Sequence, residues 1–594
     1  MTAHVFVVRG DLTDIRADVV VIPTSTEVAG DGLTIQAAAK RWGEEISSRA
    51  VGKATDRIKS VADCSGTRIN RATSYLPQGV VLVATVGKGS AIKRPVRTAA
   101  QRAIETAQEL VAKLRAEDRV STTHWFGGDT AATSRALVAI GSLTTGKGGG
   151  SNVAAANAKE QVLGIVEALK VDPGFDVVIV TWDQDAHARF LAARENAYRD
   201  ANPRDARLAD LAEVAAAVER DACVLFVGAG LSAGAGLPAW DTLVGDMANT
   251  LREEGHTRVP ETSTRRLNLD IAQHYAGSQG GADRHIAKIR DTYGPRAVGE
   301  RPPTLAHYLL LSLPMRYVVT TNYDALVERT LRGLRVPTLK VVEDGAVSLS
   351  GEKHFVTVFK IHGDADNGRA EDIVLTASEY DGFECNHPAK VALLQALLLN
   401  HHFFFVGYSR EDGNLNEVRK SVSKMLRREQ RVGWATSIGP AGASQALEDR
   451  SVKPIVFRDS RALAIALDAL ASTSVERTRV LFGNQTEAPT ELLAPLHKSL
   501  RDAADAAVAL VKGSSDPFEV EAAFHTLQAL AELGWRPLKG SGSRYELWVR
   551  IASAPSTGAS LQQRAWRAAL ADAENDGQRA QAVAALATSP GISE

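Results

Sequence analysis

A glycine-rich segment directly follows a run of apolar residues that is typical of a buried strand. The run Cys223–Val227 leads directly into Gly228-Ala229-Gly230-Leu231-Ser232-Ala233-Gly234-Ala235-Gly236-Leu237-Pro238. Glycines let the backbone approach a pyrophosphate closely, and the N–H groups and dipole at the start of a following helix favour its negative charge. The segment therefore predicts a site for nucleotide phosphates, with a tight structural turn as the alternative.

Three further polar segments follow apolar runs later in the chain. They are Thr320-Thr321-Asn322-Tyr323-Asp324, Lys360-Ile361-His362-Gly363-Asp364 and Gly407-Tyr408-Ser409. The glycine-rich segment 228–238, G-A-G-x-S-x-x-x-G-L-P, resembles the NAD-binding signature of the sirtuin family. The other three resemble that family's T-Q-N-x-D, x-x-H-G and late G-[TS]-S segments, in the family's order. The resemblance covers somewhat under half of the chain, about 206–475, and implies a Rossmann-like domain that consumes NAD.

The resemblance also implies a role for each matching residue. Asn322 would orient the nicotinamide ribose and the attacking water, His362 would be the general base, and Asp324 would order the site around Asn322. An imidazole suits the base because its ordinary pKa of about 6.5 lies near the working pH. The remaining matches, which would contact phosphate or ribose, are Gly228, Ala229, Gly230, Ser232, Gly236, Pro238, Thr320, Gly407 and Ser409. Taken singly, an Asn after a strand often caps a turn and a His at a strand end is often structural. We assign His307, His401 and His402 to structure.

The chain departs from the protein-deacylating members of that family. Their four-cysteine zinc module lies between the x-H-G segment and the late Gly-Ser turn, where this chain has only Cys385. One cysteine cannot form a tetrahedral thiolate site, so no metal is expected. Asp241 stands where the deacylases have an Arg. The segment 373–380 is similar instead to the zinc-free sirtuin-like domains of bacterial anti-phage proteins, which hydrolyse NAD. Water would then be the acceptor.

The N-terminal region carries a second, weaker resemblance. Arg9-Gly10-Asp11-Leu12-Thr13, followed by the apolar run 17–23, resembles the opening of a macro domain, a family that binds ADP-ribose. The resemblance implies that Asp11 accepts a hydrogen bond from the adenine amino group. The loops at Gly30-Asp31-Gly32 and 141–150 would offer backbone N–H groups to phosphate. Ile22 and Ser25 replace the family's two asparagines, which favours binding without turnover. A degenerate macro-like fold used for assembly is the alternative.

The elements that must position these residues form three regions. Region 1–205 alternates β and α patterns, with strands expected at 5–8, 19–22, 80–86, 136–140 and 177–181 and helices at 97–114 and 154–169. Region 206–475 has continuous apolar runs typical of buried parallel strands, at 223–227, 317–320, 357–361, 403–406, 432–435 and 455–457, with a helical insertion between 245 and 310. Region 476–594 predicts helices at 491–512, 517–533, 543–551 and 560–586. The expected fold is therefore α/β: a macro-like α/β/α domain, a Rossmann-like parallel-sheet sirtuin-type domain and a small all-α domain.

Composition limits the class of protein. The 594 residues suffice for about three to five domains. The formal net charge of -1 gives no basic field for nucleic acid, and no stretch approaches the ~18 apolar residues that span a bilayer. Three scattered cysteines argue against a disulfide framework. Because Arg9-Gly10-Asp11 ends the first apolar run, no signal peptide is expected, and we expect a cytoplasmic protein that binds neither nucleic acid nor membrane.

The sequence thus predicts an NAD glycohydrolase that releases nicotinamide and ADP-ribose, with NAD as substrate and no metal. Resemblance to the effectors of Thoeris-type bacterial defence implies activation by an ADP-ribose-derived nucleotide from a companion TIR-domain enzyme. A homo-oligomer is expected. Two rivals remain open: an NAD-dependent protein deacylase or ADP-ribosyltransferase, and a non-catalytic regulator that binds NAD or ADP-ribose.

Overall fold

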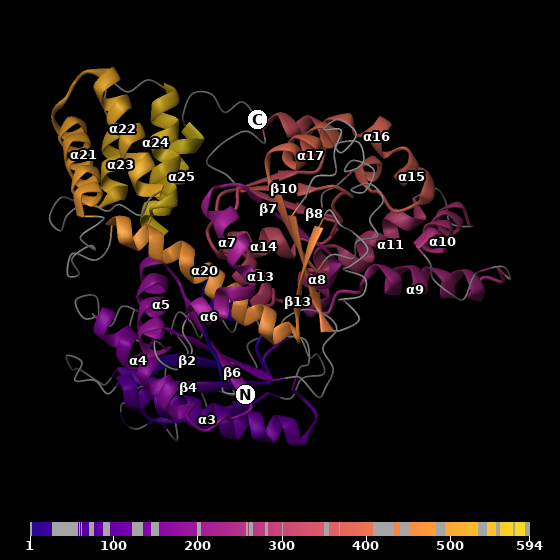
Figure 1. The fold of residues 1–594 in the computed structure, drawn as a ribbon, viewed down its shortest axis with the longest axis horizontal. Coiled ribbons are helices and arrows are strands. Elements are labelled where there is room, and N and C mark those ends of the chain that lie inside the picture. Colours follow the sequence, from indigo (N-terminus) through magenta and orange to yellow (C-terminus); the bar gives the residue numbers. More distant parts are fainter. Residues whose placement is uncertain are drawn as a thin grey trace. The chain divides into compact units, whose positions relative to one another are not determined.

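The fold is taken from a computed structural model of the chain (Figure 1). The residues that it describes are 3–25, 58, 60, 62–69, 76–86, 96–120, 135–143, 154–198, 204–256, 259, 265–278, 283–299, 301–349, 356–366, 369–407, 433–439, 452–482, 494–532, 543–553, 559–573 and 576–588. They divide into two compact units, Met1–Ser472 and Thr473–Glu594. The three-region division made from the sequence, at 205/206 and 475/476, stays a prediction.

The first unit contains a six-stranded sheet in the order β1-β6-β5-β2-β4-β3. Its strands are β1 (Val5–Arg9), β2 (Val19–Ser25), β3 (Cys64–Arg68), β4 (Gly79–Val86), β5 (Ala136–Gly141) and β6 (Phe175–Thr181). All pairings are parallel except that of β3 with β4. Helices α3 (Val96–Ala116), α4 (Ala154–Ala168) and α5 (Gln184–Tyr198) pack against one another in series beside this sheet (Figure 1). The β/α alternation of the first region is confirmed.

A second, wholly parallel sheet has the order β13-β12-β11-β7-β8-β10-β9. Its strands are β7 (Cys223–Val227), β8 (Tyr317–Thr320), β9 (Thr338–Val341), β10 (Val356–Lys360), β11 (His402–Val406), β12 (Gly433–Ile438) and β13 (Val452–Phe457). Residues of β7, β8, β10 and β11 are buried alternately in two different hydrophobic clusters, one on each face. A sheet buried on both faces explains the continuous apolar runs of the sequence.

Helices surround this second sheet. They are α6 (Arg204–Leu208), α7 (Ala212–Glu219), α8 (Ala229–Gly234), α9 (Trp240–Glu253), α10 (Arg265–Gly277), α11 (Arg284–Tyr293), α12 (Pro295–Gly299), α13 (Leu305–Leu311), α14 (Leu326–Gly333), α15 (Ala377–Asp381), α16 (Phe383–Asn386), α17 (Pro388–Asn400) and α20 (Ser460–Phe482). Helices α9 to α12 form the helical insertion that the sequence predicts. Their apolar residues share a cluster with Tyr323, Leu326 and Ile373, so the insertion packs beside the segments that follow β8 and β10.

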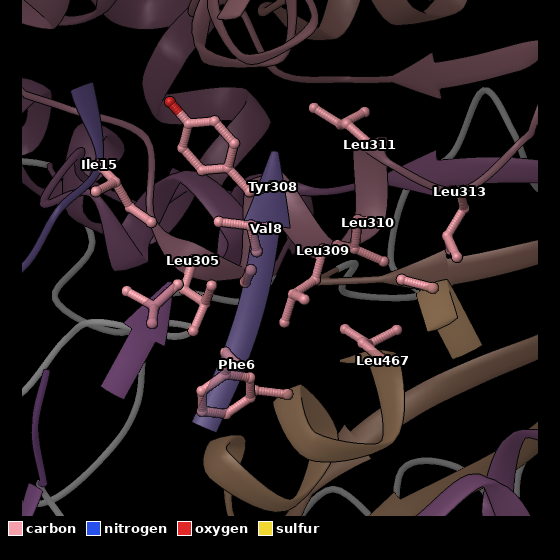
Figure 2. Close-up of a cluster of buried hydrophobic side chains, with 14 of the residues drawn as sticks. Phe6, Val8, Ile15, Leu305, Tyr308, Leu309, Leu310, Leu311, Leu313 and Leu467 are labelled. Atoms are coloured by element: carbon pink, nitrogen blue, oxygen red, sulfur yellow. The ribbon is translucent and has the colours of Figure 1, made fainter. Parts of the chain in front are cut away.

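The two sheets share one hydrophobic cluster, which helix α13 joins. Figure 2 shows Phe6 and Val8 of β1 facing Leu305 and Leu309 of α13, with Leu467 of α20 beside them. All seven residues of α13 are buried. The same cluster includes Leu225 and Val318 of the second sheet. Thus the first sheet covers one of its faces with helices from the region that follows it.

The second unit is helical. Its helices α21 (Ala494–Gly513), α22 (Pro517–Glu532), α23 (Arg544–Ala552), α24 (Ala559–Ala571) and α25 (Asp576–Thr588) surround a cluster that includes Phe524, Trp548 and Trp566. The single helix expected at 560–586 is wrong, because the structure has two. Asp572 lies at the break and accepts hydrogen bonds from Trp548 Nε1 (2.6 Å) and Arg544 of α23 (2.5 Å).

Two strands were absent from the sequence prediction, β3 and β9. Each lies at the end of its sheet and therefore pairs on one side only. β3 reads Cys-Ser-Gly-Thr-Arg, and its residues alternate between buried and half-buried. A polar edge strand of this kind lacks the apolar run on which the other strands were recognised.

Candidate active site

Four neighbouring strands of the second sheet deliver the four motifs to one edge. In the order β11-β7-β8-β10, each strand ends directly before one motif: Gly407, Gly228, the 321–324 turn and the 361–364 turn. Because the strands are parallel, all four motifs lie at the carboxyl edge. Strand β8 pairs with one side of β7, and β11, which comes later in the chain, pairs with the other side. Ligands of parallel α/β sheets bind outside the carboxyl ends of the strands at such a switch point.

The two glycine turns pack backbone against backbone. Gly228 N donates to Val406 O at 3.0 Å, and Gly230 N donates to Gly407 O at 2.8 Å. A Cβ on Gly230 would lie 2.9 Å from Gly407 O, and a Cβ on Gly407 would lie 2.6 Å from Leu231 N. Gly407 also has φ +63°, a conformation that favours glycine. The glycines at these two positions are therefore required by the packing of the turns themselves, whether or not a phosphate binds.

The end of the first motif is held by side chains from outside it. Pro238 O accepts a hydrogen bond from Tyr293 Oη at 2.9 Å. Gly236 O accepts one from Arg301, and Gly236 has φ +84°. Thus α8, with Ala229 as its first residue, and the turn that follows it are fixed against the helical insertion.

Asn322 is buried between these turns. Its Nδ2 donates to Gly228 O at 3.2 Å and to Ser232 Oγ at 3.0 Å. Its backbone N donates to Thr320 Oγ1 at 3.0 Å, and that hydroxyl donates in turn to Val227 O at 2.9 Å. Asn322 Oδ1 is buried and has no hydrogen-bond partner among the described residues. A buried acceptor without a donor is unfavourable by roughly 1–3 kcal/mol, and a ligand that donates to this oxygen would remove that cost.

Asp324 and Lys360 hold the turn that carries Asn322. Asp324 Oδ1 accepts from Leu326 N at 3.0 Å, at the start of α14. Lys360 Nζ is fully buried and donates to Asp324 O at 2.7 Å, to Tyr323 O at 3.2 Å and to Asp364 Oδ1 at 3.1 Å. One ammonium group therefore joins the turn after β8 to the turn after β10.

Burial and charge act in opposite directions on these groups. Burial raises the pKa of Asp324, although Lys360 opposes the change. Burial disfavours the charge of Lys360, but Glu328, Asp364 and Asp324 outweigh it and raise the pKa of Lys360. For Asp364 the opposing burial is likewise outweighed, and Lys360 and Lys340 lower its pKa. Lys360 is therefore charged, and its ammonium group offsets the negative charge of the nearby carboxylates Glu328 and Asp364.

His362 is buried at the carboxyl end of β10. Its Nδ1 lies 3.4 Å from Tyr380 Oη, and the two rings meet edge to face with centroids 5.1 Å apart. Its carbonyl oxygen accepts a hydrogen bond from Val374 N at 3.1 Å. The imidazole is thus held from the segment that follows it, in which sequence reasoning found no functional residue.

The structure brings most of the expected site residues together. Asn322 contacts Ser232 and Gly228 directly, Thr320 fixes its backbone, and the Ser232 side chain opposes the rise in the pKa of Asp324. Ser232 is buried, and its hydroxyl oxygen accepts a hydrogen bond from Asn322. Ser409, Gly30 and Gly32 lie outside the described residues, as does most of the 141–150 loop. The catalytic and binding roles assigned to all these residues stay predictions.

Asp11 lies at the corresponding edge of the first sheet, beyond the end of β1. Its Oδ1 accepts hydrogen bonds from the backbone N and the Oγ1 of Thr13, both at 2.8 Å. Asp11 therefore begins the short 3-10 turn Leu12–Asp14.

Sequence reasoning missed Lys360, Tyr380 and a set of arginines. Arg16 donates to Gly234 O at 2.6 Å, and Arg329 Nε donates to Asp14 Oδ2 at 3.1 Å. A lysine two residues before His362 was the available signal for Lys360. No local pattern marks the arginines, because their partners are more than 200 residues away in the chain. Tyr380 is likewise unmarked, because it lies on a different secondary-structure element from its partner His362.

Two kinds of feature, a metal-binding cluster and a membrane-spanning helix, are absent from the described part of the chain. No three His, Cys, Asp or Glu side chains gather there in a way that could hold a metal ion. In the same residues no helix combines the length and apolar composition that crossing a membrane requires.

Comparison with known proteins identifies one family model and several relatives that match part of the chain. Residues 316–455 match the family described as "SIR2-like domain". The chain is 30% identical over 218 residues to "NAD(+) hydrolase ThsA" of Enterococcus faecium, which covers 36% of this chain and 43% of that protein. It is 27% identical over 216 residues to the ThsA of Bacillus cereus (strain MSX-D12), covering 36% and 42%. The chain thus spans less than half the length of these curated relatives.

Comparison with solved structures finds a macrodomain. The Oceanobacillus iheyensis macrodomain with ADP aligns with 32% of this chain and 90% of its own, at 13% identity and a TM-score of 0.24. A score this low does not establish a common fold.

Proposed function

We propose that the chain is an NAD glycohydrolase that cleaves NAD to nicotinamide and ADP-ribose. The observation that carries the proposal is Asn322, whose buried Oδ1 has no donor in the described part of the chain and lies at the switch point beside the two glycine turns. The hydroxyl groups of a ribose are donors of the kind that this oxygen needs. The name NAD(+) hydrolase, borne by two relatives that each match 36% of the chain, supports the same reaction.

The reaction needs one water and one base. The bond between C1′ of the ribose and the nicotinamide nitrogen breaks, and nicotinamide leaves with the bonding electron pair. Water adds to C1′, and His362 takes up the proton that the water or a ribose hydroxyl releases. Asn322 orients the ribose, while Lys360 and Asp324 keep the Asn322 turn in place. The products are nicotinamide, ADP-ribose and a proton.

Product analysis tests this reaction directly. The purified full-length chain is incubated with NAD alone and with NAD plus an acetyl-lysine peptide, and the products are identified by mass. Release of nicotinamide and ADP-ribose without peptide supports the hydrolase. Strict dependence on the peptide, with an acylated ADP-ribose product, would instead indicate a deacylase. Nucleotide binding without turnover would indicate a regulator.

We further propose that an ADP-ribose-type nucleotide bound at the first sheet controls this site. The contacts of residues 11–16 support this. Asp14 pairs with Arg329 in the middle of α14, the helix that begins beside Asp324, and Arg335 beyond α14 lies 4.0 Å over the ring of Trp182. Arg16 bonds to Gly234 O at the end of α8. A ligand that moves the turn beginning at Asp11 therefore acts on both the Asn322 turn and the glycine turn.

Such control requires that the nucleotide bind the active and resting states differently. Asp11→Asn is a sharp test, because an asparagine Oδ1 can still accept from Thr13 while an NH2 donor replaces the second carboxylate oxygen. The adenine amino group, also a donor, would then be repelled. We expect the variant to keep its basal turnover and to lose stimulation by added ADP-ribose nucleotides. Equal stimulation of Asp11→Asn and the parent would remove Asp11 from the receiving site.

In the cell, the proposed role is anti-phage defence by NAD depletion. One relative, 29% identical over 129 residues, is named "Defense-associated sirtuin 2" of Bacillus subtilis, covering 21% of this chain and 12% of that protein. Cells that contain the chain with a companion TIR-domain enzyme should lose NAD on phage infection, and cells that contain Asn322→Ala should not. A homo-oligomer belongs to the same proposal and is tested by light scattering with and without nucleotide.

A further inference from the structure

The segment between His362 and α17 contributes one side chain to the candidate site. Tyr380, on the five-residue helix α15, reaches back so that its Oη lies 3.4 Å from His362 Nδ1. This distance is at the long end for a hydrogen bond. The rings meet at 69°, edge to face, so the tyrosine also restricts the plane of the imidazole.

Helix α15 is fixed well enough to give Tyr380 a defined position. Thr376 and Glu379 form a reciprocal capping box at its start. Glu379 Oε2 accepts from the backbone N of Leu375 and of Thr376, both at 2.8 Å, while Glu379 Oε1 lies 2.8 Å from His285 Nε2 on α11. In addition, Ser378 N and Oγ donate to Gln273 on α10 at 3.0 and 2.8 Å. Two helices of the insertion therefore hold α15 while it holds His362.

We propose that Tyr380 is a positioning residue for His362, whose Nδ1–H donates to the tyrosine oxygen. A neutral imidazole has one N–H and one lone pair, so a proton kept on Nδ1 leaves the lone pair on Nε2. A base that acts through Nε2 needs this tautomer, and a third group that orients the base is a general feature of such sites. Tyr380 does not itself take up the substrate proton. This inference rests on the proposed function only in making His362 the base.

Tyr380→Phe is the informative substitution, because it removes the oxygen and keeps the ring. Histidine hydrogen–deuterium exchange, read by mass spectrometry on the full-length chain without NAD, gives the pKa of His362. A hydrogen bond donated by Nδ1–H is stronger in the imidazolium, so its loss should lower that pKa by about 0.5. The charged groups on the neighbouring turns, Asp324, Lys360 and Asp364, are unchanged by the substitution. With NAD, kcat should fall roughly 3- to 10-fold and KM by less than about twofold.

Tyr317→Phe is the matched control. Tyr317 also meets a histidine ring edge to face, that of His401 with centroids 5.7 Å apart, but at the amino end of β8. It should leave the His362 pKa and kcat unchanged. An unchanged His362 pKa in Tyr380→Phe overturns the proposal, even if kcat falls, since a lower kcat alone would reflect altered packing. A raised pKa also overturns it, because Tyr380 would then be the donor. Should the parent chain not hydrolyse NAD at all, the proposed function fails while the pKa measurement still decides the hydrogen bond.

Discussion

Replacing His307 by glutamine should make the first unit less sensitive to acid. His307 is fully buried on α13, whose apolar residues belong to the cluster that the two sheets share. Its Nδ1 accepts from Thr304 N at 3.2 Å and lies 2.8 Å from Thr304 Oγ1, so the histidine takes the place of the Glu or Gln of a capping box. Burial lowers the pKa of His307 from 6.5 to about 3.

The direction of the pH effect follows from this lowered pKa. Below pH 6.5 the unfolded chain binds a proton at His307 that the folded chain refuses until the pH approaches 3. The contribution of His307 to the free energy of unfolding is therefore fully present above pH 6.5, and it is lost as the pH falls from there toward 3. Between pH 7.5 and pH 5 this single group should lower the free energy of unfolding by roughly 2 kcal/mol. Glutamine does not titrate, and its side-chain oxygen can accept from Thr304 N in place of Nδ1.

Urea unfolding followed by tryptophan fluorescence at pH 7.5, 6.5, 5.5 and 5 measures the effect. The parent should lose about 2 kcal/mol more than His307→Gln between the highest and lowest pH. His274→Gln, at an exposed histidine of α10 in the same unit, is the matched control for removing a histidine. The reasoning is refuted if His307→Gln keeps the full pH dependence of the parent, or if His274→Gln reduces it as much.

Other predictions concern the candidate site. Asn322→Ala and His362→Ala should each lose most NAD turnover, about 10²–10⁴-fold for the base, while circular dichroism and the unfolding midpoint stay near those of the parent; near-parental turnover at saturating NAD would remove that residue from the mechanism. Lys360→Met should destabilise the first unit by about 3–5 kcal/mol, because Asp364 and Glu328 would lose their buried partner. A loss of unfolding free energy below a quarter of that, measured in urea, would contradict the assigned charge network. Turnover should be unchanged by a chelator, and elemental analysis that finds one zinc per chain would refute the metal-free site.

The sequence was most informative about the strands and turns of the second sheet. Apolar runs such as Cys223–Val227 are continuous because both of their faces are buried, and this is visible without a structure. Parallel strands have their carboxyl ends at one edge, so the turns at Gly228 and Asn322 could be expected to meet. Their contact is now seen as the hydrogen bond from Asn322 Nδ2 to Gly228 O.

The remaining features depend on contacts that no local pattern encodes. A largely apolar helix such as α13 is expected to be buried, but its sequence does not say that β1, more than 290 residues earlier, packs against it. Likewise Tyr380 is one aromatic residue among many until α15 turns it toward His362. Residues that hold the site from outside, including Lys360 and Arg16, contact backbone carbonyls, and any carbonyl in the chain could serve as such a partner.

The complete burial of α13 bears on how this protein could be altered by recombination. A region of a chain is exchangeable only where its junction with the next region is exposed and few contacts cross it. Here a cut near residue 205 would uncover Leu305 and Leu309 on one side and Phe6 and Val8 on the other. A chimera that replaces the first sheet must therefore also redesign the α13 surface.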